Sequence, residues 1–283
     1  MMAAEGTRIA VLGGRGMLGS DLVQTCRQRG FDPIVLDLPE FDITDSDHLQ
    51  QAVAGAEIIV NCAAYTNVDR AESQAELAYR VNAEAAGRLG AVARDAGKWV
   101  LHISTDFVFD GCGDKPYVET DHPNPINTYG KTKLAGEQLL ARSGCEYCIV
   151  RVQWTYGSAG NNFVTKLIQR AKSQDTLKVV DDQTGSPTAT NQVAKVICKL
   201  LRKKPKGMFH FASAGYVSRF GMAEFILDKL SLNVNLLPCK TSDFPSPATR
   251  PLNSRFDCSK ITQLLDEPIE RWQAPLELFL GQL

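Results

Sequence analysis

Two stretches of the sequence carry side chains that could deliver a proton to a carbonyl oxygen. Ser104, Thr105 and Asp106 follow an apolar stretch typical of a buried strand, which would place them at the carboxyl end of a parallel sheet. Tyr129 and Lys133 are four residues apart and would share one face of a helix. A cation beside a phenol lowers the phenol pKa from about 10. The pattern therefore predicts Tyr129 as a general acid, with Ser104 or Thr105 holding the substrate oxygen.

A glycine-rich turn near the start of the chain supports this prediction, because a Tyr and a Lys at this spacing are usually a solvated helix face. Gly13, Gly16 and Gly19 follow an apolar strand over 8–12 and lead into an amphipathic helix predicted over 21–29. Glycines at such spacing permit a tight turn and let backbone amides approach a pyrophosphate. The motif predicts a dinucleotide cofactor.

An acidic residue at the end of the next predicted strand bears on which cofactor is used. Asp37 ends the strand 33–37, 18 residues after Gly19, where a carboxylate can bind the adenosine ribose and would repel a 2′-phosphate. The sequence therefore favours NADH over NADPH as the cofactor. The basic side chain of Arg15 could still accommodate NADPH.

Strand and helix patterns alternate along the chain. Strands are predicted over 8–12, 33–37, 57–61, 99–103, 147–152, 176–180 and 207–211, and helices over 21–29, 46–54, 75–96, 132–140, 161–172, 191–202 and 219–230. This alternation predicts an α/β protein with a Rossmann-type doubly wound parallel sheet and a smaller C-terminal substrate-binding cap. We expect the NAD(P)-binding domain at 1–155, with a strand contributed from about 176–181. Residues 156–283 should form most of the substrate-binding domain, interleaved with the first, and 236–253 should be loop-rich.

Composition excludes several function classes. The 283 residues are 44% hydrophobic with a net charge of −1, so nothing favours nucleic-acid binding, and the basic run Arg202–Lys206 is typical of a helix end. Met1–Glu5 lacks the pattern of a signal peptide and no run reaches transmembrane length, so we expect a cytoplasmic protein. The eight cysteines are scattered and should stay reduced. The lone Cys145–Cys148 pair has no partner pair, so no metal site is predicted.

Seven motifs give the chain a family resemblance. They are GGRGMLGS, NCAAYTNVDRAE, HISTDFVFDG, PINTYGKTKLAGE, RVQWTYG, DDQTGSPT and RPLNSRFD, spread from residue 13 to about 257. With them the chain resembles the dTDP-4-dehydrorhamnose reductase family of extended short-chain dehydrogenases/reductases. It departs from the family pattern at Phe107, where Tyr is common, and at the short loop that begins with Cys112. Neither departure removes a chemical group assigned above.

The resemblance implies a role for individual residues. The cofactor would be held by Gly13, Gly16, Met17, Leu18, Gly19, Asp37, Asp42, Ile43, Ala64, Tyr65, Thr66 and Ile103. Tyr129 would be the proton donor, and Lys133 its partner that lowers the tyrosine pKa and binds the ribose. Thr105, as a third catalytic residue, and Asp106 would contact the sugar, and Trp154 would pack on the substrate.

The same resemblance implies a reaction. NADH or NADPH would reduce the 4-keto group of dTDP-4-dehydro-L-rhamnose to give dTDP-L-rhamnose, and the chain could act as a homodimer. The substrate carries two negative charges on its diphosphate, and we expect Arg250 to meet them, with a structural ion pair as the other reading of that residue.

Two alternatives stay open from the sequence. A nucleotide-sugar epimerase or 4,6-dehydratase shares the glycine-rich turn and the Tyr129–Lys133 spacing, although Phe107 stands where a dehydratase would place a second acid. A non-catalytic NAD(P)-binding regulatory subunit of the methionine adenosyltransferase type also resembles this family. The apolar C-terminal stretch 277–281 could dock such a partner.

Overall fold

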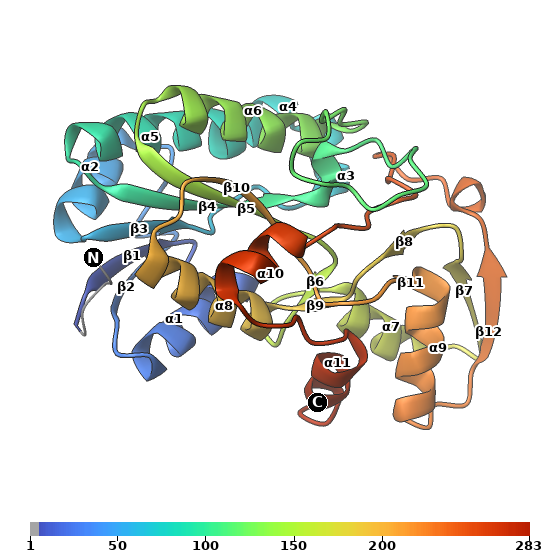
Figure 1. Ribbon diagram of the computed structural model, residues 1–283. Coiled ribbons are helices and arrows are strands. Elements are labelled where there is room, and N and C mark those ends of the chain that lie inside the picture. Colours follow the sequence, from blue (N-terminus) through green and yellow to red (C-terminus); the bar gives the residue numbers. More distant parts are fainter. Residues whose placement is uncertain (1–5) are drawn as a thin grey trace.

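A six-stranded parallel sheet forms the centre of the protein, in the order β10-β5-β4-β3-β1-β2 (Figure 1). The computed structural model describes residues 6–283, so Met1–Glu5, where the sequence predicts no signal peptide, lies outside the described residues. The strands are β1 (Arg8–Leu12), β2 (Asp32–Leu36), β3 (Ile58–Asn61), β4 (Trp99–Thr105), β5 (Glu146–Val152) and β10 (Gly207–Phe211). The chain adds β2 on one side of β1 and β3 to β5 on the other. The predicted doubly wound α/β fold is therefore confirmed.

Helices cover both faces of this sheet (Figure 1). One face packs against α1 (Met17–Gln28) and α8 (Thr190–Lys203), and the other against α2 (Ser46–Gly55), α5 (Ala85–Asp95) and α6 (Thr128–Arg142). Alternate residues of β1 face opposite layers: Ile9 and Val11 join the α1 and α8 core, whereas Ala10 and Leu12 join the other. No helix within the described part of the chain combines the length and apolar character needed to span a bilayer.

The later part of the chain builds a second lobe around its own apolar core. Its elements are β6 (Thr155–Tyr156), α7 (Phe163–Ala171), β7 (Thr176–Val180), β8 (Thr184–Gly185), β9 (Thr188–Ala189), β11 (Val217–Ser218), α9 (Arg219–Lys229), β12 (Asn235–Cys239) and α11 (Gln273–Leu280), whereas α10 (Ser259–Leu265) returns to the central sheet and packs on its α1 and α8 face. Short pairs β6–β9, β8–β11 and β7–β12 connect the elements of this lobe. Residues of α7, α9 and α11 form the core of this lobe.

The sequence-based assignment of a sheet strand at 176–181 is wrong. β7 pairs with β12 in a separate two-stranded sheet, and the sixth strand of the central sheet is β10. Exposed and buried residues alternate along β7, as expected for a strand with one solvated face, whereas the last three residues of β10 are all buried. β12 also gives regular structure to part of the stretch 236–253 that was expected to be loop-rich.

The helix predicted over 75–96 is interrupted by a π-helical turn. α4 (Ala75–Tyr79) leads into this turn, Arg80–Glu84, and then into α5, with a short α3 (Val68–Ser73) before it. Asn82 in the turn accepts from the backbone N–H of Tyr65 (2.8 Å) and donates to Thr132 Oγ1 (3.0 Å). Gly136 permits the close approach, because a Cβ there would lie 2.1 Å from Asn82 O. The turn thus connects the loop after β3 to α6.

Candidate active site

A cavity of about 610 Å³ lies at the carboxyl ends of the central strands and takes walls from both lobes. Sixteen of the eighteen residues assigned from the sequence line it. These are Gly13, Gly16, Met17, Leu18, Gly19, Asp37, Asp42, Ile43, Ala64, Thr66, Ile103, Thr105, Asp106, Tyr129, Lys133 and Trp154. The other two, Tyr65 and Arg250, are outside the lining.

The glycine-rich turn forms one end of this cavity. Gly13 has a φ of +75°, and a Cβ there would lie 2.7 Å from Ala63 N; a Cβ at Gly19 would lie 2.0 Å from Gly13 O. α1 begins at Met17, inside the motif and earlier than the predicted start at 21, because the extended Gly16 caps it. No acidic side chain occupies its first turn. The free amides and the helix dipole suit the diphosphate of a dinucleotide, so these residues fit an NAD(P) cofactor.

An acidic and a basic side chain stand where the adenosine ribose would bind. The Asp37 carboxylate accepts from the backbone N–H of Arg15 (2.7 Å) and of Leu38 (2.9 Å). The Arg15 guanidinium bonds Glu40 at 2.6 Å, and about half of each of these side chains is exposed. Asp37 is therefore fixed, whereas Arg15 is held by a surface ion pair of little strength.

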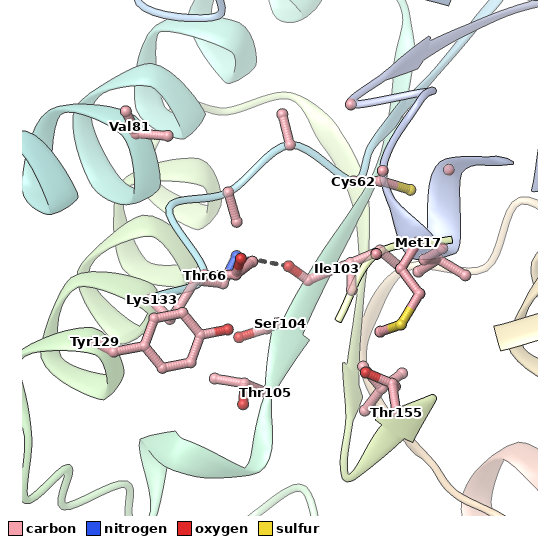
Figure 2. Close-up of a pocket in the computed structure, with 18 of the residues that line it drawn as sticks. Met17, Cys62, Thr66, Val81, Ile103, Ser104, Thr105, Tyr129, Lys133 and Thr155 are labelled. Atoms are coloured by element: carbon pink, nitrogen blue, oxygen red, sulfur yellow. Dashed lines mark hydrogen bonds between the residues drawn. The ribbon is translucent and has the colours of Figure 1, made fainter. Parts of the chain in front are cut away.

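Tyr129 sits in the first turn of α6, beside the end of β4. Asn127 caps the helix by accepting from Gly130 N (2.8 Å), and its amide donates to Thr249 O (2.8 Å). A Cβ at Gly130 would lie 2.1 Å from Phe107 O, so this glycine lets the helix start against the segment after β4. Figure 2 shows the Tyr129 hydroxyl turned towards the β4 end. Tyr129, Ser104 and Thr105 therefore line the same cavity.

The electrostatics of Tyr129 differ from the sequence-based expectation. Burial in the cavity and the nearby Asp106 carboxylate raise the pKa of Tyr129, where we expected Lys133 to lower it. The Lys133 Nζ instead donates to Ile103 O at 2.7 Å, the dashed line in Figure 2, and contacts His102 Nε2 at 3.3 Å. Tyr129 is therefore held as a protonated phenol at neutral pH, which is the form a proton donor needs.

Buried polar atoms beside Tyr129 lack partners within the protein. Ser104 is 2% exposed and its Oγ has no hydrogen-bond partner. Thr105 Oγ1 donates to Asp106 Oδ1 (3.0 Å) and accepts from Phe107 N (3.2 Å). A buried hydroxyl without a partner is costly, so the Ser104 Oγ is suited to a ligand oxygen.

Arg219 is a cavity residue that the sequence analysis missed. Its guanidinium lies 3.6 Å from the Trp154 ring centroid and 4.9 Å from that of Phe163. Trp154 has a φ of +46°, and Gly185 makes room for its indole, since a Cβ there would lie 2.6 Å from the ring. Burial lowers the pKa of Arg219 to about 9, which leaves it charged at pH 7. The two aromatic rings therefore hold a positively charged side chain at the wall of the cavity.

Arg250 and Tyr65 are the two sequence-assigned residues whose side chains bind elsewhere in the protein. Arg250 binds Asp69 through both terminal nitrogens, at 2.6 and 2.7 Å, which is the structural ion pair that the sequence left open. The Tyr65 hydroxyl donates to Gln74 Oε1 at 2.7 Å. Both side chains are thus engaged outside the cavity lining, and the local sequence pattern carried no signal for either partner.

Comparison with known proteins places this architecture in a family. The model of the RmlD substrate binding domain matches residues 7–283. The dTDP-4-dehydrorhamnose reductase of Salmonella typhimurium is 38% identical over 240 residues, 80% of each chain, and that of Escherichia coli is 34% identical over 97% of each. The Bacillus anthracis enzyme of the same name, crystallised with NADP, is 36% identical and superposes with a TM-score of 0.94, covering 98% of this chain and all of that one. This chain therefore belongs to the RmlD family, that of the dTDP-4-dehydrorhamnose reductases.

Proposed function

We propose that this chain is an NAD(P)H-dependent oxidoreductase that reduces the 4-keto group of dTDP-4-dehydro-L-rhamnose to give dTDP-L-rhamnose. The observation that carries the proposal is one cavity that contains both the glycine turn Gly13–Gly19 and the Tyr129 hydroxyl beside Ser104. A dinucleotide and a ketone can therefore meet in it. The substrate follows from the names of the relatives, and the cofactor class is that of the Bacillus anthracis enzyme.

Each catalytic side chain has a proposed task. Bound NAD(P)H supplies the hydride that reduces the ketone carbon. Tyr129 donates its proton to the oxygen that becomes negatively charged, and Ser104 and Thr105 orient that oxygen by hydrogen bonding. Asp106 fixes the Thr105 hydroxyl, and Lys133 binds the nicotinamide ribose. At the other end of the cavity, the first amides of α1 bind the diphosphate.

The direct test is the loss of reduced-nicotinamide absorbance after addition of dTDP-4-dehydro-L-rhamnose, with NADH and NADPH assayed in parallel. We expect oxidation of one cofactor per ketone reduced. Conversion of a nucleotide sugar without net oxidation would favour an epimerase or dehydratase. Cofactor binding with no turnover of any ketosugar would favour the regulatory-subunit reading.

Substitution of Arg219 tests which cation meets the substrate diphosphate. We propose Arg219 in place of Arg250, because the donors of Arg250 are committed to Asp69. Arg219→Met should raise KM for the dTDP-sugar about 10- to 100-fold, as charge-assisted hydrogen bonds to phosphate are lost. Arg250→Met is the matched control and should alter thermal stability more than KM. If Arg250→Met raises KM more than Arg219→Met does, the diphosphate is bound by Arg250, as expected from the sequence.

Glu40 should influence the choice between NADH and NADPH. Its carboxylate binds the Arg15 guanidinium, which also donates to Leu38 O (3.0 Å) beside Asp37 and is a cation that could accept a 2′-phosphate. Glu40→Gln frees that cation, so kcat/KM for NADPH relative to NADH should rise roughly two- to fivefold, the scale of an exposed ion pair. Arg15→Gln should move the same ratio downwards. If the ratio of kcat/KM for NADPH to that for NADH is unchanged in both variants, Arg15 does not influence the choice of cofactor.

Location and assembly are further proposals. All eight cysteines are free, which suits a reducing compartment, and the reaction uses a nucleotide-activated sugar, so we propose a cytoplasmic enzyme. A homodimer stays a prediction, which light scattering of the purified protein tests.

A further inference from the structure

Two buried polar side chains that the mechanism above does not use, Asn61 and His102, lead to Lys133. Asn61 and His102 are paired across the neighbouring strands β3 and β4, and each is 1% exposed. Asn61 Nδ2 lies 3.0 Å from His102 Nδ1, and His102 Nε2 lies 3.3 Å from Lys133 Nζ. Neither Asn61 nor His102 lines the cavity. Their chemistry therefore acts on Lys133 rather than on a ligand.

The hydrogen-bond pattern fixes where the His102 ring carries its proton. Asn61 Oδ1 accepts from the backbone N–H of Ala63 at 3.1 Å, so the amide must present its NH₂ group to His102. An amide nitrogen only donates. His102 Nδ1 must then accept, which leaves the ring proton of the neutral imidazole on Nε2.

This proton faces the catalytic lysine. An Nε2–H needs an acceptor, and Lys133 Nζ offers a lone pair only as the neutral amine, since an ammonium has donors alone. The same Nζ donates to Ile103 O at 2.7 Å, which an amine can also do. We propose that Asn61 and His102 are positioning residues that hold Lys133 as a neutral amine in the cofactor-free enzyme, so that Lys133 takes up a proton when NAD(P) binds. This inference depends on the proposed function for its cofactor.

The surroundings of Lys133 agree with this assignment. Burial lowers the pKa of Lys133 to about 8, so the neutral amine predominates above that pH, and burial also lowers the pKa of His102 well below its ordinary value, which keeps the imidazole neutral. Glu137 on α6 and Cys62 after β3 act in the opposite direction, but Glu137 is already bonded to Arg151 at 2.6 and 2.9 Å. When a dinucleotide binds, the ribose oxygens assigned to Lys133 accept hydrogen bonds, and an ammonium, which has three donors and no lone pair, is the form that satisfies them best. That ammonium then stabilises the phenolate left when Tyr129, on the same helix, gives up its proton.

Nitrogen NMR of the cofactor-free enzyme labelled with ¹⁵N-histidine reads the tautomer directly. The chain has four histidines, and the buried His210 is an internal reference. Its Nδ1 faces Tyr117 O (3.1 Å) and its Nε2 faces an Arg151 donor (3.4 Å), so His210 should carry its proton on Nδ1. The signals that disappear in His102→Gln belong to His102. We expect them to show the opposite tautomer, with the proton on Nε2. An Nδ1–H or imidazolium His102 at pH 9, above the Lys133 pKa, would overturn the proposal.

Asn61→Asp tests the consequence for Lys133. The carboxylate only accepts, so it draws the His102 proton to Nδ1 and turns Nε2 into an acceptor for the Lys133 ammonium. Calorimetry of NADP⁺ binding at pH 9, in buffers with different ionisation enthalpies, should show uptake of about one proton in the wild type, because the Lys133 pKa returns towards about 10.4. Under the same conditions, the Asn61→Asp variant should take up less than half as many protons as the wild type.

Two further readouts keep this test decisive. The basic limb of kcat/KM should move to higher pH by about one unit in Asn61→Asp, and the charge-neutral variant His102→Gln separates the effect of the tautomer from that of the added carboxylate charge. His102→Gln, whose amide oxygen can also accept from an ammonium, should reproduce both effects if Asn61→Asp does not fold. Equal proton uptake in the wild type and in a folded variant would overturn the proposal. A wild type that binds NADP⁺ yet reduces no ketosugar would instead overturn the proposed function, since the tautomer and the proton uptake do not require turnover.

Discussion

Tyr129→Phe should lower kcat for ketone reduction by about 10²- to 10⁴-fold, the range that positioned proton transfer contributes. The substitution removes only the hydroxyl, because the ring can keep its edge-to-face contact with Phe107, whose centroid lies 5.6 Å away. Burial and the Asp106 carboxylate raise the pKa of Tyr129, so the phenol keeps its proton at neutral pH until the developing negative oxygen accepts it. Without it, the negative oxygen formed by hydride addition has no adjacent acid. Affinity for NADPH, measured by fluorescence, should change little.

Tyr65→Phe is the matched control for this variant. Tyr65 also follows a central strand and loses a hydroxyl, but that hydroxyl is bonded to Gln74 outside the cavity lining. Its kcat should stay within about twofold of the wild type, since a partly exposed hydrogen bond away from the reacting atoms contributes about 1 kcal/mol to stability and nothing to the reaction. If Tyr129→Phe keeps more than a tenth of the wild-type kcat, Tyr129 is not the proton donor, and Asp106 becomes the candidate.

Features that depend on local geometry could be predicted from the sequence. Gly13 has a positive φ and Gly19 contacts Gly13 O within the same turn, so the glycine pattern could be recognised from the local sequence, although Gly13 also makes room for Ala63 after β3. Tyr129 and Lys133 needed only the helical period to be placed on one face. The same reasoning failed for the tyrosine pKa, because spacing on a helix does not say which acceptor the lysine amine will choose. Here β4 provides that acceptor, Ile103 O.

Features that depend on packing between distant segments could not be predicted. Arg219 reaches the cavity only because α9 packs beside the loop after β5, where Trp154 adopts a left-handed backbone. Arg250 lies in a motif that predicted contact with the substrate diphosphate. Its guanidinium is instead paired with Asp69, which is 181 residues away in the sequence. The choice of β10 as the sixth strand is similar, because strand propensity sets neither neighbour nor sheet.

Glu137→Leu should lower the free energy of unfolding by about 3–5 kcal/mol, the cost of breaking a buried ion pair from one side. Glu137 and Arg151 are 3% and 2% exposed and are joined by two hydrogen bonds, 2.6 and 2.9 Å long. With the carboxylate gone, the close partners of Arg151 within residues 6–283 are the Phe109 ring, whose centroid lies 5.0 Å from the guanidinium carbon, and the neutral His210. Neither neutralises a buried guanidinium. Urea unfolding followed by circular dichroism measures the change.

The double variant Glu137→Leu with Arg151→Met separates the unpaired charge from lost packing. Removing both charges avoids the desolvation cost, so most of the lost stability should return. If the double variant is as unstable as Glu137→Leu, the loss comes from side-chain volume. The pair also bears on catalysis, because Glu137 follows Lys133 by one helical turn and raises its pKa. In a double variant that folds, the Lys133 pKa should fall and the basic limb of kcat/KM should move to lower pH, opposite to its expected movement in Asn61→Asp.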